Sequence, residues 1–180
     1  VSISGHKIHA SKGVGALYIR QGLRLPPLLN GGGQEGGLRP GTEPLPAIAA
    51  FGAAAAEAKA QMAQYLPRMQ QLRQHCADAL CARLPGLVLI PGGAAHILSI
   101  SLPGYRSEVL MNFLEARGIS VSKSSACKKG GRSHVLEAMG LSAPVIDGAL
   151  RIGLSRFTTQ EELDALALAL GEAAATLAHR

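Results

Sequence analysis

Three side chains near the start of the chain have the types and spacing needed to bind a phosphate and an aldehyde: Ser4, His6 and Lys7. A hydroxyl, an imidazole and the neighbouring backbone N–H groups are suited to holding a phosphate. A lysine in a rigid, partly desolvated site has a lowered pKa, and its free amine can then attack an aldehyde. Taken alone, the pattern is more typical of an ordinary lysine in a loop, so this chemistry needs support from elsewhere in the sequence.

A second group of residues surrounds Cys127. Four cations lie close to it in sequence, namely Lys123, Lys128, Lys129 and Arg132. Cations near a thiol favour the thiolate, and the glycines at 130–131 would let the segment move between a substrate and an acceptor. A buried structural cysteine is a poor explanation in so polar a segment. We therefore interpret Cys127 as a reactive nucleophile.

The composition excludes several classes of protein. The chain has 180 residues, of which 47% are hydrophobic and 17% charged, so it can bury a core and is not a disordered segment. Its net charge of +6 suits an anionic ligand. Three Phe, three Tyr and no Trp are too few for a surface that stacks nucleic-acid bases, and the basic run 128–132 is too short for a phosphate footprint.

The cysteines and histidines indicate the compartment and argue against a metal. The three cysteines form no CxxC pair and no even set, so we expect reduced thiols in a cytoplasmic, cytosol-like environment. Cys76 and Cys81 lie on a predicted helix and are interpreted as core residues. The histidines show no ligand spacing with one another or with cysteine, so we expect no metal site. The sequence shows neither a signal peptide nor an apolar run that could span a membrane.

Three regions must position these residues. Residues 1–45 are rich in glycine and strand-like, with a strand expected at 14–20 and a five-glycine loop at 31–37. Residues 46–83 show apolar side chains at spacings of three and four, which predicts a long amphipathic helix. Pro67 lies inside that helix and should kink or split it, so we expect a helix in two pieces.

Residues 84–180 alternate between strand and helix patterns, which predicts a small α/β domain with helices on one face of a sheet. Strands are expected at 96–102, 119–121 and 149–154, and helices at 107–117 and 133–139. Gly118 is the expected left-handed cap of the first of these helices. The segment 158–161 is read as a capping box that opens a last helix. That helix turns four leucines inward: Leu163, Leu166, Leu170 and Leu177.

Four segments resemble, in order, the motifs of the class V aminotransferase and cysteine desulfurase superfamily. They are the lysine segment 4–13, the segment 31–43 that reads GGGQE followed by RPGT, the SSAC segment 124–127, and the segment 149–159 that reads LRIGLSRFTT after its alanine. The Ser-Ala-Cys form is similar to the first group of cysteine desulfurases, which supply sulfur for iron–sulfur clusters and for thiolated tRNA. The resemblance covers the C-terminal half of such enzymes and implies part of a fold-type I pyridoxal-phosphate-dependent transferase.

The resemblance assigns cofactor roles to four residues. It implies pyridoxal 5'-phosphate as cofactor, with Lys7 as the lysine that binds it covalently. Ser4 and His6 would contact the cofactor phosphate. Thr42 would reach the phosphate of a partner subunit's cofactor, which implies a homodimer.

The resemblance also implies a substrate and its acceptor. L-cysteine would dock its carboxylate on Arg151, because a planar guanidinium can bind a carboxylate through two parallel hydrogen bonds. Cys127 would take the substrate sulfur as a persulfide and leave L-alanine. An iron–sulfur scaffold or a tRNA-thiolation enzyme would accept the sulfur, with no direct contact to nucleic acid or membrane.

Several positions differ from the family's usual motifs. The GPKG motif reads ASKG at 10–13, a His is replaced by Asn30, and the RSGT motif contains Pro40. Gly153 stands where the family usually has serine, and Ser155 stands where it usually has glycine. None of these changes removes a reacting group, although Pro40 alters the approach to Thr42.

The sequence lacks one group that pyridoxal chemistry needs. The ring nitrogen is normally paired with an acidic side chain. Of the three aspartates, Asp78 and Asp164 lie in predicted helices and Asp147 lies in a turn late in the chain, so none is a plausible partner. We therefore expect residues 1–45 to be a remnant of the cofactor-binding domain, 46–83 a connecting helix and 84–180 a complete small domain. A fragment of this kind is expected to be inactive alone.

Two other functions remain open from the sequence. An aminotransferase or selenocysteine lyase of the same superfamily would keep Lys7 and Arg151, but an aminotransferase would not need Cys127. A non-catalytic module would retain only surfaces for a partner subunit or an acceptor protein.

Overall fold

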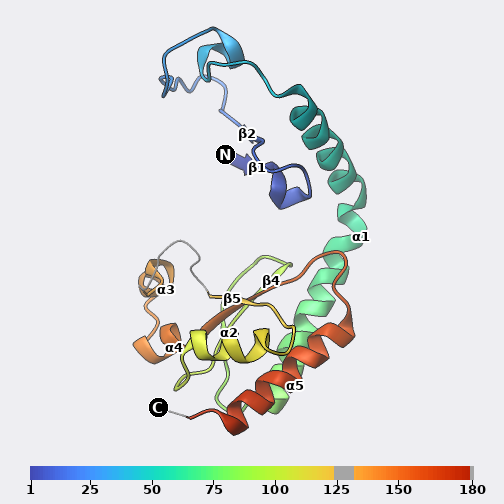
Figure 1. Cartoon of the computed structure of the whole chain (residues 1–180), viewed down its shortest axis with the longest axis vertical. Coiled ribbons are helices and arrows are strands. Elements are labelled where there is room, and N and C mark those ends of the chain that lie inside the picture. The colour runs from blue at the N-terminus through green and yellow to red at the C-terminus, as the bar shows by residue number, and fades with distance from the viewer. Residues whose placement is uncertain (124–131, 179–180) are drawn as a thin grey trace. The chain divides into compact units, whose positions relative to one another are not determined.

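The computed structural model describes residues 1–123 and 132–178, and the chain forms two compact units, unit 1 (residues 1–63) and unit 2 (residues 64–180). One helix, α1 (Leu45–Arg83), belongs to both (Figure 1). It runs through Pro67 without a break, so the expected division into two pieces is wrong. A proline removes only one helical hydrogen bond, to the carbonyl four residues earlier. That carbonyl belongs to Ala63, the last residue of unit 1.

Unit 1 contains little regular structure before α1. Strand β1 (Ser2–Ser4) pairs with β2 (Gly15–Leu17) in antiparallel register, which confirms a strand within 14–20. Two short 3-10 helices accompany these strands: η1 (Gly5–Ile8) lies between β1 and β2, and η2 (Gln34–Gly37) follows β2. Gly5 is the only residue of 1–63 that is buried.

Unit 2 is built on a four-stranded antiparallel sheet. Its strands are ordered β3 (Val88–Ile90), β4 (Ile97–Ser101), β6 (Ala149–Gly153) and β5 (Ser122–Lys123). The expected strands at 96–102 and 149–154 are confirmed. The strand expected at 119–121 lies instead at 122–123.

The core of unit 2 lies between one face of the sheet and three helices. Side chains alternate between the two faces of a strand, and β4 and β6 turn their large apolar residues toward α1, α2 (Ser107–Glu115) and α5 (Gln160–Thr176). The buried side chains at this interface include Leu80, Leu98, Ile100, Leu110, Leu150 and Leu170. Figure 1 shows α2 and α5 next to each other, below the strands labelled β4 and β5. This arrangement confirms the expected α/β layer.

Two short helices cover part of the other face. Helices α3 (His134–Ala138) and α4 (Ala143–Asp147) contribute Leu136 and Ile146 to a small apolar cluster with Ala149 of β6. The Ser101 hydroxyl in β4 donates to the carbonyl of Val145 in α4 at 2.6 Å. This end of the second face is therefore closed, and α3 confirms the helix expected at 133–139.

Helix ends follow the expected chemistry, with small shifts. Gly118 has a φ of 75°, and the Ile119 N–H donates to the carbonyl of Leu114, which closes the expected left-handed cap. Because Ile119 completes this cap, the next strand starts later than its sequence pattern suggests. The capping box of α5 pairs Thr159 with Glu162, one residue beyond the expected position.

The apolar stripe of α1 has two different environments. Leu72, Cys76 and Leu80 are buried in unit 2, whereas Met62 is 51% exposed. Cys81 is also exposed, so the expectation that it is a core residue is wrong. Five residues correspond to about 140° beyond a full helical turn, which places Cys81 away from the face that holds Cys76. No helix within the described residues is long and apolar enough to cross a membrane.

Candidate functional site

Lys7 lies on a short turn between the two strands of unit 1. Ser4 ends β1, and His6 and Lys7 belong to η1, which ends at His9 in the left-handed region with a φ of 67°. The side chains of Ser4, His6 and Lys7 are all exposed. The structure thus brings the three predicted cofactor contacts together on one exposed turn.

Close backbone contacts make this turn rigid. The Gly5 N–H donates to the carbonyl of Val14 at 2.8 Å, and a Cβ at Gly5 would lie 2.9 Å from the Val14 side chain. A Cβ at Gly15 would lie 2.5 Å from the carbonyl oxygen of Ile3. Only glycine fits at these two positions. The glycines around Lys7 therefore fix the turn that carries its amine.

The two halves of the glycine-rich motif fold against each other. The Gly41 N–H donates to the side-chain oxygen of Gln34 at 3.2 Å, and a Cβ at Gly31 would lie 2.6 Å from the ring of Pro40. Pro40 thus packs on the backbone of the triple glycine. Thr42, which follows this contact, is exposed.

Arg151 lies on the second face of the sheet in unit 2. In the register of β4, β6 and β5 it is opposite Ser99 on one side and Ser122 on the other. Its neighbours in β6, Leu150 and Ile152, point into the core, so Arg151 points away from it. The guanidinium is therefore the centre of a row of polar side chains across the sheet, and it is half-buried.

Cys127 lies outside the described residues, so the structure gives no position for it. The residues on either side of the gap are described, and both are paired with carboxylates. Lys123 donates to Glu108, and Arg132 binds both oxygens of Asp147 at 2.8 and 2.9 Å. Two of the four cations expected to favour the Cys127 thiolate are thus paired with carboxylates, and the other two, Lys128 and Lys129, lie outside the described residues.

The three aspartates are also occupied within unit 2. Asp147 binds Arg132, Asp164 lies 2.7 Å from the His75 ring, and Asp78 accepts from the side chain of Gln74. Unit 1 has no aspartate. The residues on the Lys7 turn therefore fit the phosphate and the aldehyde of pyridoxal phosphate, but no aspartate in this chain is available for its ring nitrogen.

One buried thiol and two paired carboxylates have altered acidities. Burial, with a further contribution from the charge of Asp164, raises the pKa of the Cys76 thiol from 9.0 to about 12. The hydrogen bonds from Arg132 and Lys123 lower the pKa of Asp147 and of Glu108 respectively. Cys76 is therefore an inert thiol, and both carboxylates remain ionised at neutral pH.

The sequence did not indicate the role of Arg68, whose side chain holds the loop after β6. The Arg68 guanidinium, on α1, donates to the carbonyl of Arg156 at 2.7 Å and to that of Thr158 at 2.9 Å. This loop follows the strand that carries Arg151, so Arg68 restrains its C-terminal continuation. Bonds between a side chain and a backbone 88 and 90 residues away leave no pattern in local spacing.

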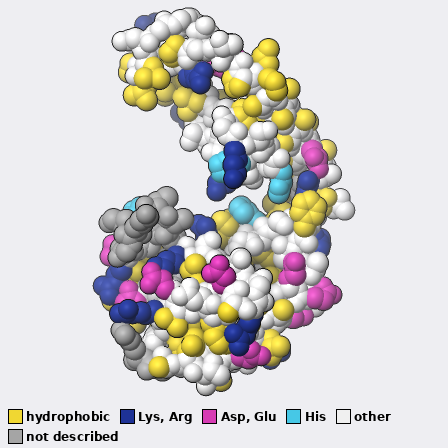
Figure 2. All heavy atoms as spheres, in the orientation of Figure 1, with side chains coloured by type: hydrophobic (Ala, Val, Ile, Leu, Met, Phe, Trp, Pro, Cys, Tyr) yellow, Lys and Arg dark blue, Asp and Glu magenta, His cyan; other side chains and the backbone are white. Residues whose placement is uncertain are grey.

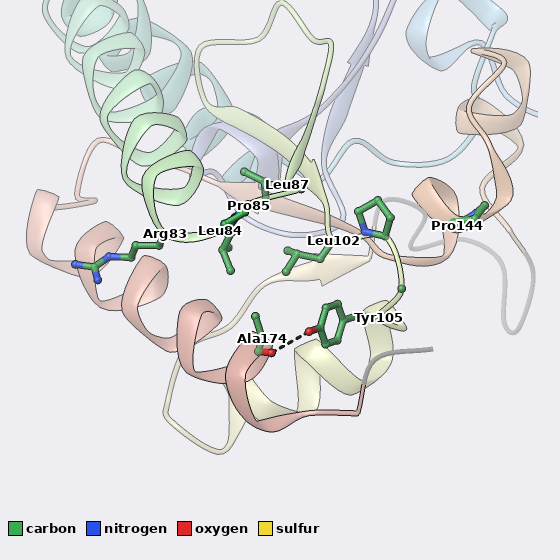
Figure 3. A pocket seen from close by; sticks show the side chains of 11 residues that line it. Arg83, Leu84, Pro85, Leu87, Leu102, Tyr105, Pro144 and Ala174 are labelled. Carbon is green, nitrogen blue, oxygen red and sulfur yellow. Dashed lines mark hydrogen bonds between the residues drawn. The ribbon is translucent and has the colours of Figure 1, made fainter.

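A cavity of about 490 Å³ lies elsewhere in unit 2 (Figure 3). It is lined mainly by apolar residues at the end of α1 and by the turn after β4, among them Leu84, Leu102 and Pro103. The Tyr105 hydroxyl at its wall donates to the carbonyl of Ala174 at 2.9 Å. None of the described residues that line it is a predicted site residue. Among the described residues, no group of three His, Cys, Asp or Glu could hold a metal ion.

Curated relatives of the chain are cysteine desulfurases. Cysteine desulfurase 2 of Trichormus variabilis is 39% identical over 169 residues, which are 91% of this chain and 42% of the relative. The cysteine desulfurase of Rhodobacter capsulatus is 39% identical over 182 residues, 98% of this chain and 47% of the relative. The chain thus spans less than half the length of these relatives.

The fold is shared with solved NifS-like proteins. One NifS-like protein superposes with a TM-score of 0.86 at 36% identity, covering 98% of this chain and 46% of its own. The NifS-like protein of Rickettsia africae gives a TM-score of 0.87 at 27% identity over 97% of this chain and 47% of its own. The profile of the aminotransferase class-V family matches residues 1–166. On this match, which includes the Lys7 turn and Arg151, the chain belongs to the class V aminotransferase family.

Proposed function

We propose that this chain is part of a pyridoxal-phosphate-dependent cysteine desulfurase that converts L-cysteine to L-alanine and an enzyme persulfide. The observation that carries the proposal is the Lys7 turn, where the exposed side chains of Ser4, His6 and Lys7 lie on one backbone turn that admits only glycine at Gly5 and Gly15. The cysteine desulfurases among its relatives support the choice of substrate.

The cofactor would be held by residues of unit 1. Lys7 would bind its aldehyde carbon, and Ser4 and His6 would donate to its phosphate. When bound, pyridoxal phosphate supplies an electron sink for the bonds at the substrate Cα. Since all three aspartates of this chain are paired within unit 2, a complete site needs another carboxylate for the ring nitrogen.

Arg151 would fix the substrate carboxylate. Its backbone lies in β6, paired with Ser99 of β4 on one side and Ser122 of β5 on the other, so three strands set the position from which the side chain leaves the sheet. A bidentate bond to the carboxylate leaves the substrate sulfur at the other end of the molecule. This geometry orients cysteine before any bond is broken.

Lys7 and Cys127 would carry the proton and the sulfur. With its amine free, Lys7 would remove the proton at Cα as a general base. The Cys127 thiolate would attack the substrate sulfur, forming an S–S bond while the Cβ–S bond breaks. The electron pair of that bond stays with the carbon fragment, which takes up a proton to give alanine. Cys127 is left as a persulfide.

The remaining assignments concern partners and compartment. Thr42 is exposed, as a residue that reaches a second subunit's cofactor must be, and we propose a homodimer on that basis. A sulfur-acceptor protein, for iron–sulfur cluster assembly or for tRNA thiolation, would take the persulfide sulfur from Cys127 in the cytoplasm.

The test uses the protein made from its complete reading frame and loaded with pyridoxal phosphate. Alanine and sulfide are measured separately after L-cysteine is added. We expect Lys7→Ala to lower alanine formation by at least about 10²-fold, because it removes both the cofactor bond and the base. Cys127→Ser is expected to bind cysteine but to transfer no sulfur.

Two matched controls sharpen this test. Lys12→Ala removes a neighbouring exposed lysine, and Cys81→Ser removes an exposed cysteine, and both should keep the parent rate. Sulfide release by Cys127→Ser at the parent rate would contradict the role given to Cys127.

A second candidate is a binding module without pyridoxal chemistry. The observation in its favour is that all three aspartates are paired within unit 2. The complete protein separates the two candidates when pyridoxal phosphate is added. A visible absorbance band that borohydride removes, with the label on Lys7, supports the enzyme, whereas unchanged spectra support the module.

A further inference from the structure

The second face of the sheet in unit 2 is closed at one end of β6 and open at the other. At the closed end, Ala149 is 2% exposed and packs against Leu136 of α3 and Ile146 of α4. At the other end lies Gly153, where an added Cβ would meet no atom of the described residues within 4 Å. Arg151 lies midway between Ala149 and Gly153 and on the same face, because alternate residues of a strand share a face. Along β6, a molecule held by Arg151 therefore has room toward Gly153 and not toward Ala149.

The fold gives no reason for a glycine at residue 153. Gly153 does not have a positive φ, and a Cβ there would not clash with the described residues. It pairs with Ile97 in a register that runs without a bulge to the other end of β6. The Leu154 N–H donates to the carbonyl of His96 at 2.8 Å, so the pairing continues past Gly153. A glycine inside a paired strand weakens it, and here neither the backbone nor the packing requires one.

Gly153 is also the neighbour of Arg151 that fills no space. On this face, the half-buried side chains of Ser99 and Ser122 border Arg151 across the strands. Along β6, Arg151 is bordered by the covered Ala149 and by Gly153. A strand glycine that the fold does not require is typical of a place where a ligand approaches the backbone. The guanidinium beside it is suited to a ligand that carries a carboxylate.

We propose that Gly153 is a specificity-determining residue, which leaves room beside Arg151 for an α-amino acid with a side chain longer than that of cysteine. This rests on the proposed function, which assigns the substrate carboxylate to Arg151. The carboxylate lies on the guanidinium, and the remainder of the amino acid lies over the bare backbone at Gly153. The ligand class is a thiol-bearing α-amino acid, and it includes L-homocysteine, which is one methylene longer than L-cysteine.

The size of residue 153 should decide which of these amino acids binds. The related motif usually has serine at this position, so Gly153 leaves more space beside Arg151 than the usual motif does. In a closely fitting pocket, one methylene changes affinity by about 10- to 200-fold. A serine side chain at residue 153 would take up the space that the longer amino acid needs. We therefore expect Gly153→Ser to separate the two amino acids and Gly153→Val to exclude both.

The test measures the binding of L-cysteine and of L-homocysteine by calorimetry. It uses the protein from its complete reading frame, loaded with pyridoxal phosphate and carrying Cys127→Ser, so that binding is recorded without sulfur transfer. With Gly153 in place, the two dissociation constants should agree within about tenfold. Gly153→Ser should weaken homocysteine binding by at least about tenfold and cysteine binding by less than about threefold. Gly153→Val should weaken the binding of both by at least about tenfold.

Gly171→Ser is the matched control. Gly171 lies in α5, which packs on the opposite face of the sheet, and an added Cβ there likewise meets no atom of the described residues within 4 Å. This variant should leave both dissociation constants unchanged. Thermal unfolding checks that the Gly153 variants are folded. Because serine and valine lose less entropy than glycine in a strand, both variants should keep or raise the unfolding midpoint.

Several results would overturn the inference. They are equal weakening of the two amino acids in Gly153→Ser, unchanged binding in Gly153→Val, the same losses in Gly171→Ser, and a protein with Gly153 that binds cysteine but not homocysteine. A lowered unfolding midpoint in both Gly153 variants would also contradict it, since the glycine would then serve the fold. Failure of the proposed function looks different, because the protein with Gly153 then binds neither amino acid, and the inference falls with it.

Discussion

Units 1 and 2 differ in how far they bury their own apolar side chains. Unit 1 exposes many large hydrophobic residues, including Leu17, Tyr18, Leu23, Leu28 and Leu29, and buries only Gly5. Unit 2 buries a continuous core between its sheet and three helices. On the face drawn in Figure 2, hydrophobic surface is prominent in unit 1, whereas charged side chains are spread over unit 2.

This difference means that the predicted site residues are positioned in two different ways. The Lys7 turn is kept in shape by local glycine contacts and not by a core. Arg151 is held by a sheet whose opposite face is fully packed. We infer that unit 2 is stabilised by its own contacts, and that unit 1 depends for its stability on contacts which its own residues do not make.

The largest expected difference is in hydrogen exchange. Amides of β4 and β6 should exchange only through unfolding of the core, while those of β1 and β2 should open locally. We expect protection factors in the two sheets to differ by about a thousandfold, measured by mass spectrometry on the native chain. Equal protection in both sheets would show that unit 1 has a stable core of its own.

Truncation of leucines compares the units directly. Leu80 is 0% exposed in unit 2, and Leu28 is 95% exposed in unit 1. Leu80→Ala should lower the free energy of unfolding by about 2–5 kcal/mol, since it leaves a cavity. Leu28→Ala should change it by less than about 0.5 kcal/mol. Denaturant unfolding followed by circular dichroism measures both, and comparable losses would contradict the comparison.

Alkaline pH should weaken unit 2 through Cys76. Its pKa is raised from 9.0 to about 12, so the folded state keeps the proton after the unfolded chain has lost it. The stabilising effect is complete below pH 9.0 and is lost as the pH rises toward about 12. Near the middle of this range the loss is on the order of 2 kcal/mol. Cys76→Ala lacks this dependence, so the difference between parent and variant should shift with pH across this window, and a constant difference would refute the assignment.

The smallest effect concerns the start of α5. The Thr159 hydroxyl accepts from the Glu162 N–H at 3.3 Å, and the Glu162 carboxylate accepts from the Thr159 N–H at 3.0 Å. Thr159→Ala should lower the stability of unit 2 by about 1 kcal/mol. Thr42→Ala in unit 1 removes an exposed hydroxyl outside any helix and should leave the unfolding midpoint unchanged. A loss of stability in Thr42→Ala would show an unrecognised structural role.

Local chemistry made much of unit 2 predictable. Gly118 ends α2 as expected because only a left-handed residue closes that cap, and Thr159 opens α5 because its neighbours provide the reciprocal bond. The predictions from sequence were wrong where tertiary contacts determine the local structure. Pro67 does not divide α1. Cys81 faces solvent, although cysteine is a residue type that suits a core.

The residues of the candidate site could be predicted where they are neighbours within one sequence motif. Ser4, His6 and Lys7 stand together in sequence and share one turn in the structure. The row of Arg151 with Ser99 and Ser122 depends on strand register, and no local spacing encodes it. The pairing of Arg132 with Asp147 joins residues fifteen apart and likewise required the fold.

The most direct test of the central claim is to locate the sulfur. The protein from the complete reading frame, loaded with pyridoxal phosphate, is given L-cysteine, quenched with an alkylating agent and digested for mass spectrometry. We expect one additional sulfur atom on the peptide that contains Cys127, and none on that peptide in Lys7→Ala. Alanine formation with the extra sulfur on Cys81, or with no extra sulfur on Cys127, would contradict it.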